Sequence, residues 1–171
     1  MPARVLLEGR PGSGKTTAAE AVVALLRDAG LAPAGFLTRE IRTGGRREGF
    51  EIEDLSGGRE VLAHVDLPGP PKVGRYGVDL AALERVALPA LERTKDADAL
   101  VIDELGKMEL ASERLREAVT EAFEGPLPVV ATVLAGRHPF TDELKSRHEV
   151  LRVTAATRND LPEEVVARLR G

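Results

Sequence analysis

The sequence contains no cysteine, no tryptophan and no glutamine, and its one asparagine is Asn159. Without cysteine, neither a disulfide nor a cysteine-bound metal site can form. No apolar run is long enough to span a bilayer, so we expect no membrane partner. The chain has 19 arginines, five lysines and few thermolabile side chains. This composition is typical of a heat-adapted protein, although a high-GC genome would also enrich arginine.

Charge and length restrict the class of protein further. The net charge is −4 and no block of like charges occurs, which makes nucleic acid an unlikely main partner. The 171 residues are enough for one domain, residues 1–171, with a sizeable core. The first apolar strand begins too early to leave room for a signal peptide, so we expect a cytoplasmic protein. Composition indicates no particular oligomeric state.

A glycine-rich motif is the strongest functional signal. Residues 9–16 read GRPGSGKT, a complete G-x-x-x-x-G-K-[ST] phosphate-binding loop, between a predicted strand at 5–7 and a predicted helix at 17–29. Such a loop turns its backbone N–H groups towards phosphate, and the helix N-terminus adds partial positive charge. Lys15 would reach the β- and γ-phosphates, and the Thr16 hydroxyl would bind Mg²⁺. The predicted nucleotide-binding residues here are Gly9, Arg10, Pro11, Gly12, Ser13, Gly14, Lys15, Thr16 and Thr17.

The remaining pattern predicts an α/β fold. Residues 31–35 resemble a turn, and 36–65 consist of alternating runs separated by Gly-Gly pairs, which is typical of antiparallel hairpins. Residues 68–77 are rich in proline and glycine and predict an irregular loop. We expect helices at 80–93 (with a kink or break at Pro89), 112–123, 139–147 and 161–170, and strands at 99–102, 127–134 and 150–154. Together these predict a P-loop NTPase three-layer sandwich, with a mainly parallel sheet extended by antiparallel hairpins at one edge.

A pair of acidic residues follows the predicted strand at 99–102. Asp103 would lie at the carboxyl end of that strand, where ligands bind in open α/β sheets, and would hold Mg²⁺ opposite Thr16. Glu104 beside it could orient and polarise an attacking water as a general base. This pair favours hydrolysis over transfer to a second substrate. Lys107 could contact phosphate or be solvated.

Later segments contain further candidates. Thr132 could sense the γ-phosphate if its strand lies between those of the phosphate-binding loop and Asp103; otherwise it is an ordinary β-branched strand residue. Arg137 is the candidate arginine finger, with Arg147 a weaker alternative. Arg158 and Asn159 could stack on and hydrogen-bond a nucleobase, while Asn159 or Asp160 could also cap the last helix.

The chain resembles a known family over nearly its whole length, the small thermostable nucleoside-triphosphatases related to human cancer-related nucleoside-triphosphatase. The resemblance depends on GRPGSGKTT at 9–17, GFLTREIRTGGRREGFEI at 35–52 and VIDELGKMEL at 101–110. It implies Mg²⁺-dependent hydrolysis of ATP, GTP, CTP or UTP to diphosphate and phosphate, with little base preference. It also implies that Lys15 and Glu104 are central to catalysis. The second nucleotide-binding segment that it implies comprises Leu100, Val101, Ile102, Asp103, Glu104, Leu105, Gly106 and Lys107.

Two other functions fit a phosphate-binding loop. A small-molecule or nucleotide kinase would need an acceptor pocket, which Arg39, Arg42, Arg46 and Arg47 could form unless they are simply solvated. A nucleotide-dependent, RNA-associated switch would use the hairpins as its binding face, but the sequence lacks the expected basic stripe. Phosphate release without an acceptor favours hydrolysis over the kinase, and stimulation by RNA favours the switch.

Overall fold

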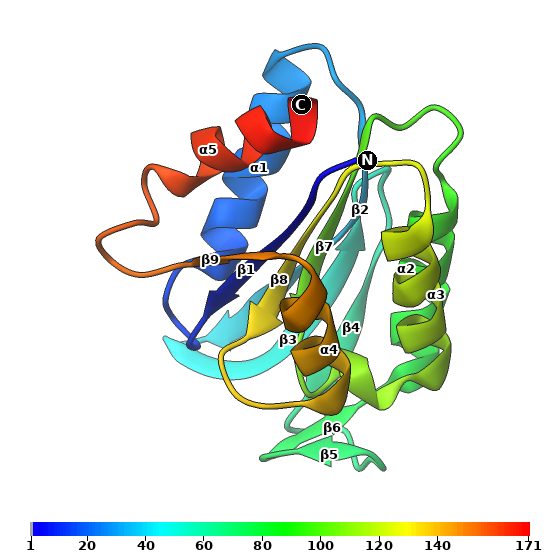
Figure 1. The fold of residues 1–171 in the computed structure, drawn as a ribbon. Coiled ribbons are helices and arrows are strands. Elements are labelled where there is room, and N and C mark those ends of the chain that lie inside the picture. The colour runs from blue at the N-terminus through cyan, green and yellow to red at the C-terminus, as the bar shows by residue number, and fades with distance from the viewer. Residues whose placement is uncertain (1) are drawn as a thin grey trace.

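A computed structural model describes residues 2–171, which form one mixed sheet of nine strands with helices on both faces (Figure 1). The strand order is β5-β6-β4-β3-β2-β7-β8-β1-β9. The elements in chain order are β1 (Arg4–Gly9), α1 (Lys15–Asp28), β2 (Pro33–Thr43), β3 (Arg46–Asp54), β4 (Arg59–His64), β5 (Lys72–Val73), β6 (Tyr76–Val78), α2 (Leu80–Glu92), β7 (Ala99–Leu105), the 3₁₀ helix η1 (Glu109–Ala111), α3 (Glu113–Glu124), β8 (Val129–Leu134), α4 (Pro139–Arg147), β9 (Glu149–Arg152) and α5 (Leu161–Arg170).

The sheet has a parallel half and an antiparallel half that share strand β2. β2, β7, β8, β1 and β9 pair in parallel, while β3, β4, β6 and β5 extend the sheet in antiparallel pairs. β2 pairs with β7 only over Pro33–Phe36. Its later residues pair with β3 and pass the carboxyl end of β7. The long strand therefore brings Thr38 beside the edge of the sheet where parallel strands place ligands.

Two apolar clusters hold the three layers together. One joins α1 and α5 to one face of the sheet, through residues such as Val22 and Val165. The other joins α2 and α3 to the opposite face, around Phe36 and Leu115. Figure 1 shows the same arrangement, with α1 and α5 on one side and α2 and α3 on the other. The apolar β7 and β8 are buried because helices cover both faces of a parallel sheet.

Most predicted elements are present, and several boundaries differ. The predicted ranges of α4 and α5 match the structure, with a proline in the first turn of each, where its missing N–H costs nothing. Pro89 does not break α2, which continues to Glu92. The predicted turn at 31–35 is wrong from Pro33, where β2 begins. The segment 68–77 is not wholly irregular, because it contains the short β5 and most of β6. Within residues 2–171, no helix combines the length and apolar character that a membrane span requires.

Candidate functional site

The glycine-rich loop connects the end of β1 to the start of α1. Gly9 is the last residue of β1 and Lys15 the first of α1. Gly12 and Gly14 have φ values of 79° and 102°, in the left-handed region that favours glycine. The Gly14 carbonyl accepts the first helical hydrogen bond, from Ala18 N at 2.8 Å. The loop therefore leads directly into a helix N-terminus, the arrangement that binds phosphate.

Lys15 joins this loop to the acidic motif on β7. Its side chain is buried, and its Nζ donates to the Gly9 carbonyl at 2.7 Å. The same Nζ lies 3.0 Å from Glu104 Oε2. The two segments that the sequence indicated separately thus meet at one ammonium group, and Glu104 remains partly open, with 28% of its side chain exposed.

Asp103 is the most deeply buried acid of the site, with no exposed surface. One carboxylate oxygen, Oδ1, accepts hydrogen bonds from Thr132 Oγ1 at 2.6 Å and Thr16 Oγ1 at 3.3 Å, and Oδ2 accepts from Thr38 N at 3.3 Å. Burial raises the pKa of Asp103 to about 6, while the hydrogen bond from Thr132 acts in the opposite direction. These interactions hold the carboxylate in place beside Thr16.

The oxygen atoms of Thr16 and Asp103 are hard donors of the kind that Mg²⁺ prefers. Residues 2–171 contain no cluster of three or more His, Cys, Asp or Glu side chains suited to holding a metal by themselves. A magnesium ion needs no such cluster, because it commonly uses one or two protein ligands together with water and substrate phosphates. The donor set therefore fits magnesium bound together with a nucleotide.

The structure answers the question about Thr132. β8 does lie between β1 and β7, as the sensor hypothesis required. The hydroxyl, however, is buried and donates to Asp103. Thr132 therefore acts on the site through the carboxylate that it binds.

The segment 100–107 divides into a core part and a site part. Leu100, Val101 and Ile102 were predicted to bind nucleotide, but each is at most 1% exposed and packs in the apolar clusters. Their packing corrects that prediction, because the β7 side chains that contact Thr16 and Lys15 are those of Asp103 and Glu104. Leu105 is also buried, whereas Lys107 is exposed.

The candidate arginines lie further out. Arg137 lies on the loop that follows β8, and its side chain is 94% exposed. Its Nε lies 3.5 Å from Oδ2 of Asp142 in α4. Arg158 packs against the phosphate-binding loop, because a Cβ added at Gly14 would lie 3.2 Å from Arg158 Cδ. Asn159 is exposed. Asp160 occupies the N-cap position of α5 without a side-chain capping bond.

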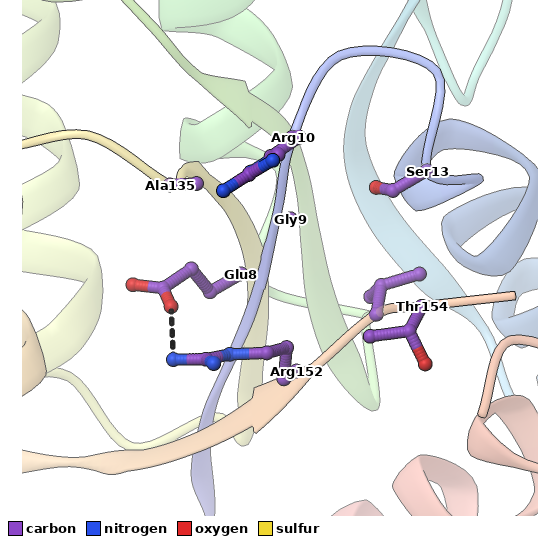
Figure 2. Close-up of a pocket in the computed structure, with 8 residues that line it drawn as sticks. Glu8, Gly9, Arg10, Ser13, Ala135, Arg152 and Thr154 are labelled. Carbon is purple, nitrogen blue, oxygen red and sulfur yellow. Dashed lines mark hydrogen bonds and ion pairs between the residues drawn. The ribbon is translucent and has the colours of Figure 1, made fainter. Parts of the chain in front are cut away.

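A hollow of about 520 Å³ lies beside the loop, where β1, β8 and β9 end. Its wall includes Gly9, Arg10, Ser13 and Thr154 (Figure 2). Ser13 Oγ has no hydrogen-bond partner and is inaccessible to solvent. The hollow therefore borders the loop at Gly9, Arg10 and Ser13.

The hairpin arginines are mostly paired with acids. Arg39 forms ion pairs with Glu53 and Glu20, and Arg42 and Arg47 both pair with Glu40. Paired guanidinium groups offer little to a phosphate acceptor or to RNA. The geometry thus favours the simpler interpretation of these residues as positions on a solvated hairpin.

Two residues at the site were missed in the sequence. Thr38 contributes a backbone N–H, which carries no side-chain signal and depends on the path of β2 past β7. Glu109 is buried at 5% exposure and accepts a hydrogen bond from Gly106 N at 3.0 Å. The one available signal for Glu109 was its position between the apolar Met108 and Leu110.

Comparisons with known proteins identify a family and a shared fold. A family model described as NTPase matches residues 4–166. Nucleoside-triphosphatase THEP1 of Thermotoga sp. (strain RQ2) is 41% identical over 170 residues, which cover 98% of this chain and 95% of the relative. The crystal structure of THEP1 from the hyperthermophile Aquifex aeolicus superposes with a TM-score of 0.85 at 30% identity, covering 98% and 99% of the two chains. The solution structure of a human cancer-related nucleoside triphosphatase gives a TM-score of 0.82 at 37% identity, with 96% of each chain covered.

Proposed function

This chain belongs to the NTPase family, and from that premise we propose that it hydrolyses ATP, GTP, CTP and UTP to the diphosphate and phosphate, with Mg²⁺ and little base preference. The observation that carries the proposal is the 3.0 Å contact between Lys15 Nζ and Glu104 Oε2. It brings the candidate general base next to the lysine that a phosphate-binding loop directs at the β- and γ-phosphates.

The phosphates would be held by the backbone N–H groups of residues 9–16 and by Lys15. These donors would offset the charge that develops as the bond to the γ-phosphate breaks. Thr16 and Asp103 would hold Mg²⁺, which supplies further positive charge when bound. The resident hydrogen bonds from Thr132 and Thr38 keep Asp103 oriented for that purpose.

Glu104 would take a proton from a water molecule as the water oxygen attacks the γ-phosphorus in line. The bond between the γ-phosphorus and the bridging oxygen then breaks, and the diphosphate leaves. The partial exposure of Glu104 supports this role, because water can reach the carboxylate. Arg137 remains the proposed finger, and it would have to turn away from Asp142 to contact the γ-phosphate.

Broad base tolerance is supported by the kind of residues available near the loop. Arg158 packs on Gly14 and could stack on any base through its guanidinium plane. Asn159 is exposed, so its hydrogen bonds to a base would compete with water. Stacking discriminates little between bases, since every base has a π-face.

The test measures phosphate release from each of the four nucleotides with Mg²⁺ and no acceptor. We expect Glu104→Gln to lower kcat by about 10²–10⁴-fold while nucleotide still binds, since it removes the base and leaves the loop intact. Lys15→Ala should weaken binding as well as turnover. Exposed Glu117 and Lys72 supply matched controls as Glu117→Gln and Lys72→Ala. Absence of phosphate release by the unmodified protein would reject hydrolysis, and full activity of Glu104→Gln would reject the assigned base.

A further inference from the structure

Glu109 is a buried acid for which the proposed chemistry provides no use. It is the first residue of η1 and is 5% exposed. Glutamate is almost never fully buried unless it is paired. The 18 ion pairs of the described residues, 2–171, do not include Glu109. Its burial therefore needs another explanation.

Its carboxyl group stabilises the turn that follows the acidic motif on β7, Asp103 and Glu104. Gly106 N donates to Glu109 Oε1 at 3.0 Å, and the Gly106 carbonyl accepts from Leu110 N at 2.9 Å. The far side of this turn is rigid, because Leu110 lies in the core and Ser112 caps α3 by accepting from Leu115 N. Gly106 is thus fixed to η1 and α3 by both of its backbone polar groups.

Gly106 is also where the two glutamates converge. A Cβ atom added at Gly106 would lie 3.1 Å from Glu109 Oε1 and 3.2 Å from Glu104 Oε2. Both oxygens therefore lie in tighter than ordinary van der Waals contact with the position that a Cβ would take. Glu104 Oε2 also contacts Lys15, so this one oxygen lies between the lysine and the Gly106 turn.

The protonation of Glu109 fits this close approach. Burial, and secondly the charge of Glu104, raise the pKa of Glu109 to about 8. Near pH 7 the group would therefore hold a proton, which avoids repulsion between the buried Glu109 and the neighbouring Glu104 carboxylate. A neutral carboxyl still accepts the Gly106 hydrogen bond through one oxygen. Glutamine reproduces that form in size and acceptor.

We propose that Glu109 is a positioning residue for Glu104: by holding Gly106 and filling the space behind the turn, it keeps the Glu104 carboxylate beside Lys15. The inference rests on the proposed function, because it concerns the orientation of the base in that reaction. Glu109 itself touches neither nucleotide nor water in this scheme. Its loss would let Glu104 rotate or shift, and a misplacement of about 1 Å can cost about 100-fold in rate.

Three variants separate positioning from stability. Glu109→Met keeps most of the volume and removes the acceptor, and replacing a buried acid by an apolar side chain need not destabilise the fold. We expect kcat to fall by about 10- to 100-fold while the equilibrium affinity for nucleotide stays within about threefold. The kcat of Glu109→Gln should stay within about threefold of that of the unmodified protein, because glutamine keeps the acceptor for Gly106 N. Gly106→Ala should lower kcat like Glu109→Met, and the double variant should show less than the sum of the two effects.

The matched control is Glu117→Met on the exposed face of α3, which should leave kcat unchanged. Wild-type kcat in folded Glu109→Met, or an equal fall in Glu109→Met and Glu109→Gln, would overturn the positioning role while hydrolysis itself stands. No phosphate release by the unmodified protein would overturn both this inference and the proposed function. A fall in nucleotide affinity without a fall in kcat in Glu109→Met would also contradict the positioning role, because Glu109 would then act on binding.

Discussion

The hydrogen bond from Thr132 to Asp103 offers a sharp test of how the site is built. Both residues are buried, and the hydroxyl lies 2.6 Å from Asp103 Oδ1. Thr132→Val replaces the hydroxyl by a methyl group of similar size on the same β-branched framework. It therefore removes the shortest of the three hydrogen bonds to Asp103 and leaves those from Thr16 and Thr38 N.

The expected loss follows from the charge of the acceptor. A hydrogen bond to an ionised group contributes about 1.5–3 kcal/mol, and a buried methyl group returns about 0.8 kcal/mol. The net loss of unfolding free energy is then about 1–2 kcal/mol. For a chain of this size that corresponds to a fall in Tm of about 2–8 °C. Removing the bond also raises the pKa of Asp103 further, because the hydrogen bond from Thr132 lowers it.

The assay is thermal unfolding of the nucleotide-free protein without metal at pH 8, where Asp103, with a pKa of about 6, is ionised. Repeating it at pH 5 should shrink the difference, because a neutral carboxyl forms a weaker hydrogen bond. Thr120→Val is the control, since Thr120 is exposed and bonds to Arg116 O within its own helix. An unchanged Tm in Thr132→Val at pH 8, or an equal change in both variants, would refute the account of Asp103 as a buried carboxylate held by this hydroxyl.

Two further predictions concern Glu109 and the arginines. The pKa of Glu109 is raised above its ordinary value, so its stabilising contribution is complete below about pH 4.5 and is lost as pH rises through about 8, since the unfolded chain releases its proton first. Thermal melts should therefore show the Tm of wild type falling relative to Glu109→Gln across that range, and a constant difference would contradict the buried proton. Steady-state kinetics should show more than a tenfold fall in kcat for Arg137→Ala with affinity kept, whereas Arg158→Ala should raise KM with kcat unchanged. A raised KM in Arg137→Ala together with a lowered kcat in Arg158→Ala would contradict the assignment of Arg137 as the finger and of Arg158 as the base contact.

Local patterns predicted the parts of the fold that depend on neighbouring residues. The glycine-rich motif at 9–16 can be recognised in the sequence, and a strand and a helix flank it as expected. The Gly-Gly pairs mark real turns, because positive φ at Gly44 and Gly45 connects β2 to β3. The helix predicted from residue 112 begins as α3 with Ser112 as its cap. Each of these features is determined by residues within a few positions of one another.

Features that depend on contacts between distant segments could not be predicted from the sequence. The irregular segment at 68–77 forms a small hairpin because β6 pairs with the distant β4. The family resemblance implied that residues 100–102 bind nucleotide, but their apolar run belongs to a strand buried on both faces. The arginines of the hairpin gave no sequence sign of their acidic partners, which come from α1 and β3 as well as from β2 itself.

The sequence by itself identified a phosphate-binding loop motif at 9–16 and an acid pair, Asp103 and Glu104, directly after an apolar strand. The tertiary structure alone decided what those acids meet. It placed β8 between β1 and β7, so that Thr132 binds Asp103, and it placed Glu109 behind Glu104 at Gly106. The physical reason is that strand order and burial depend on how distant segments pack, and burial together with hydrogen bonding sets the charge and orientation of a carboxyl group.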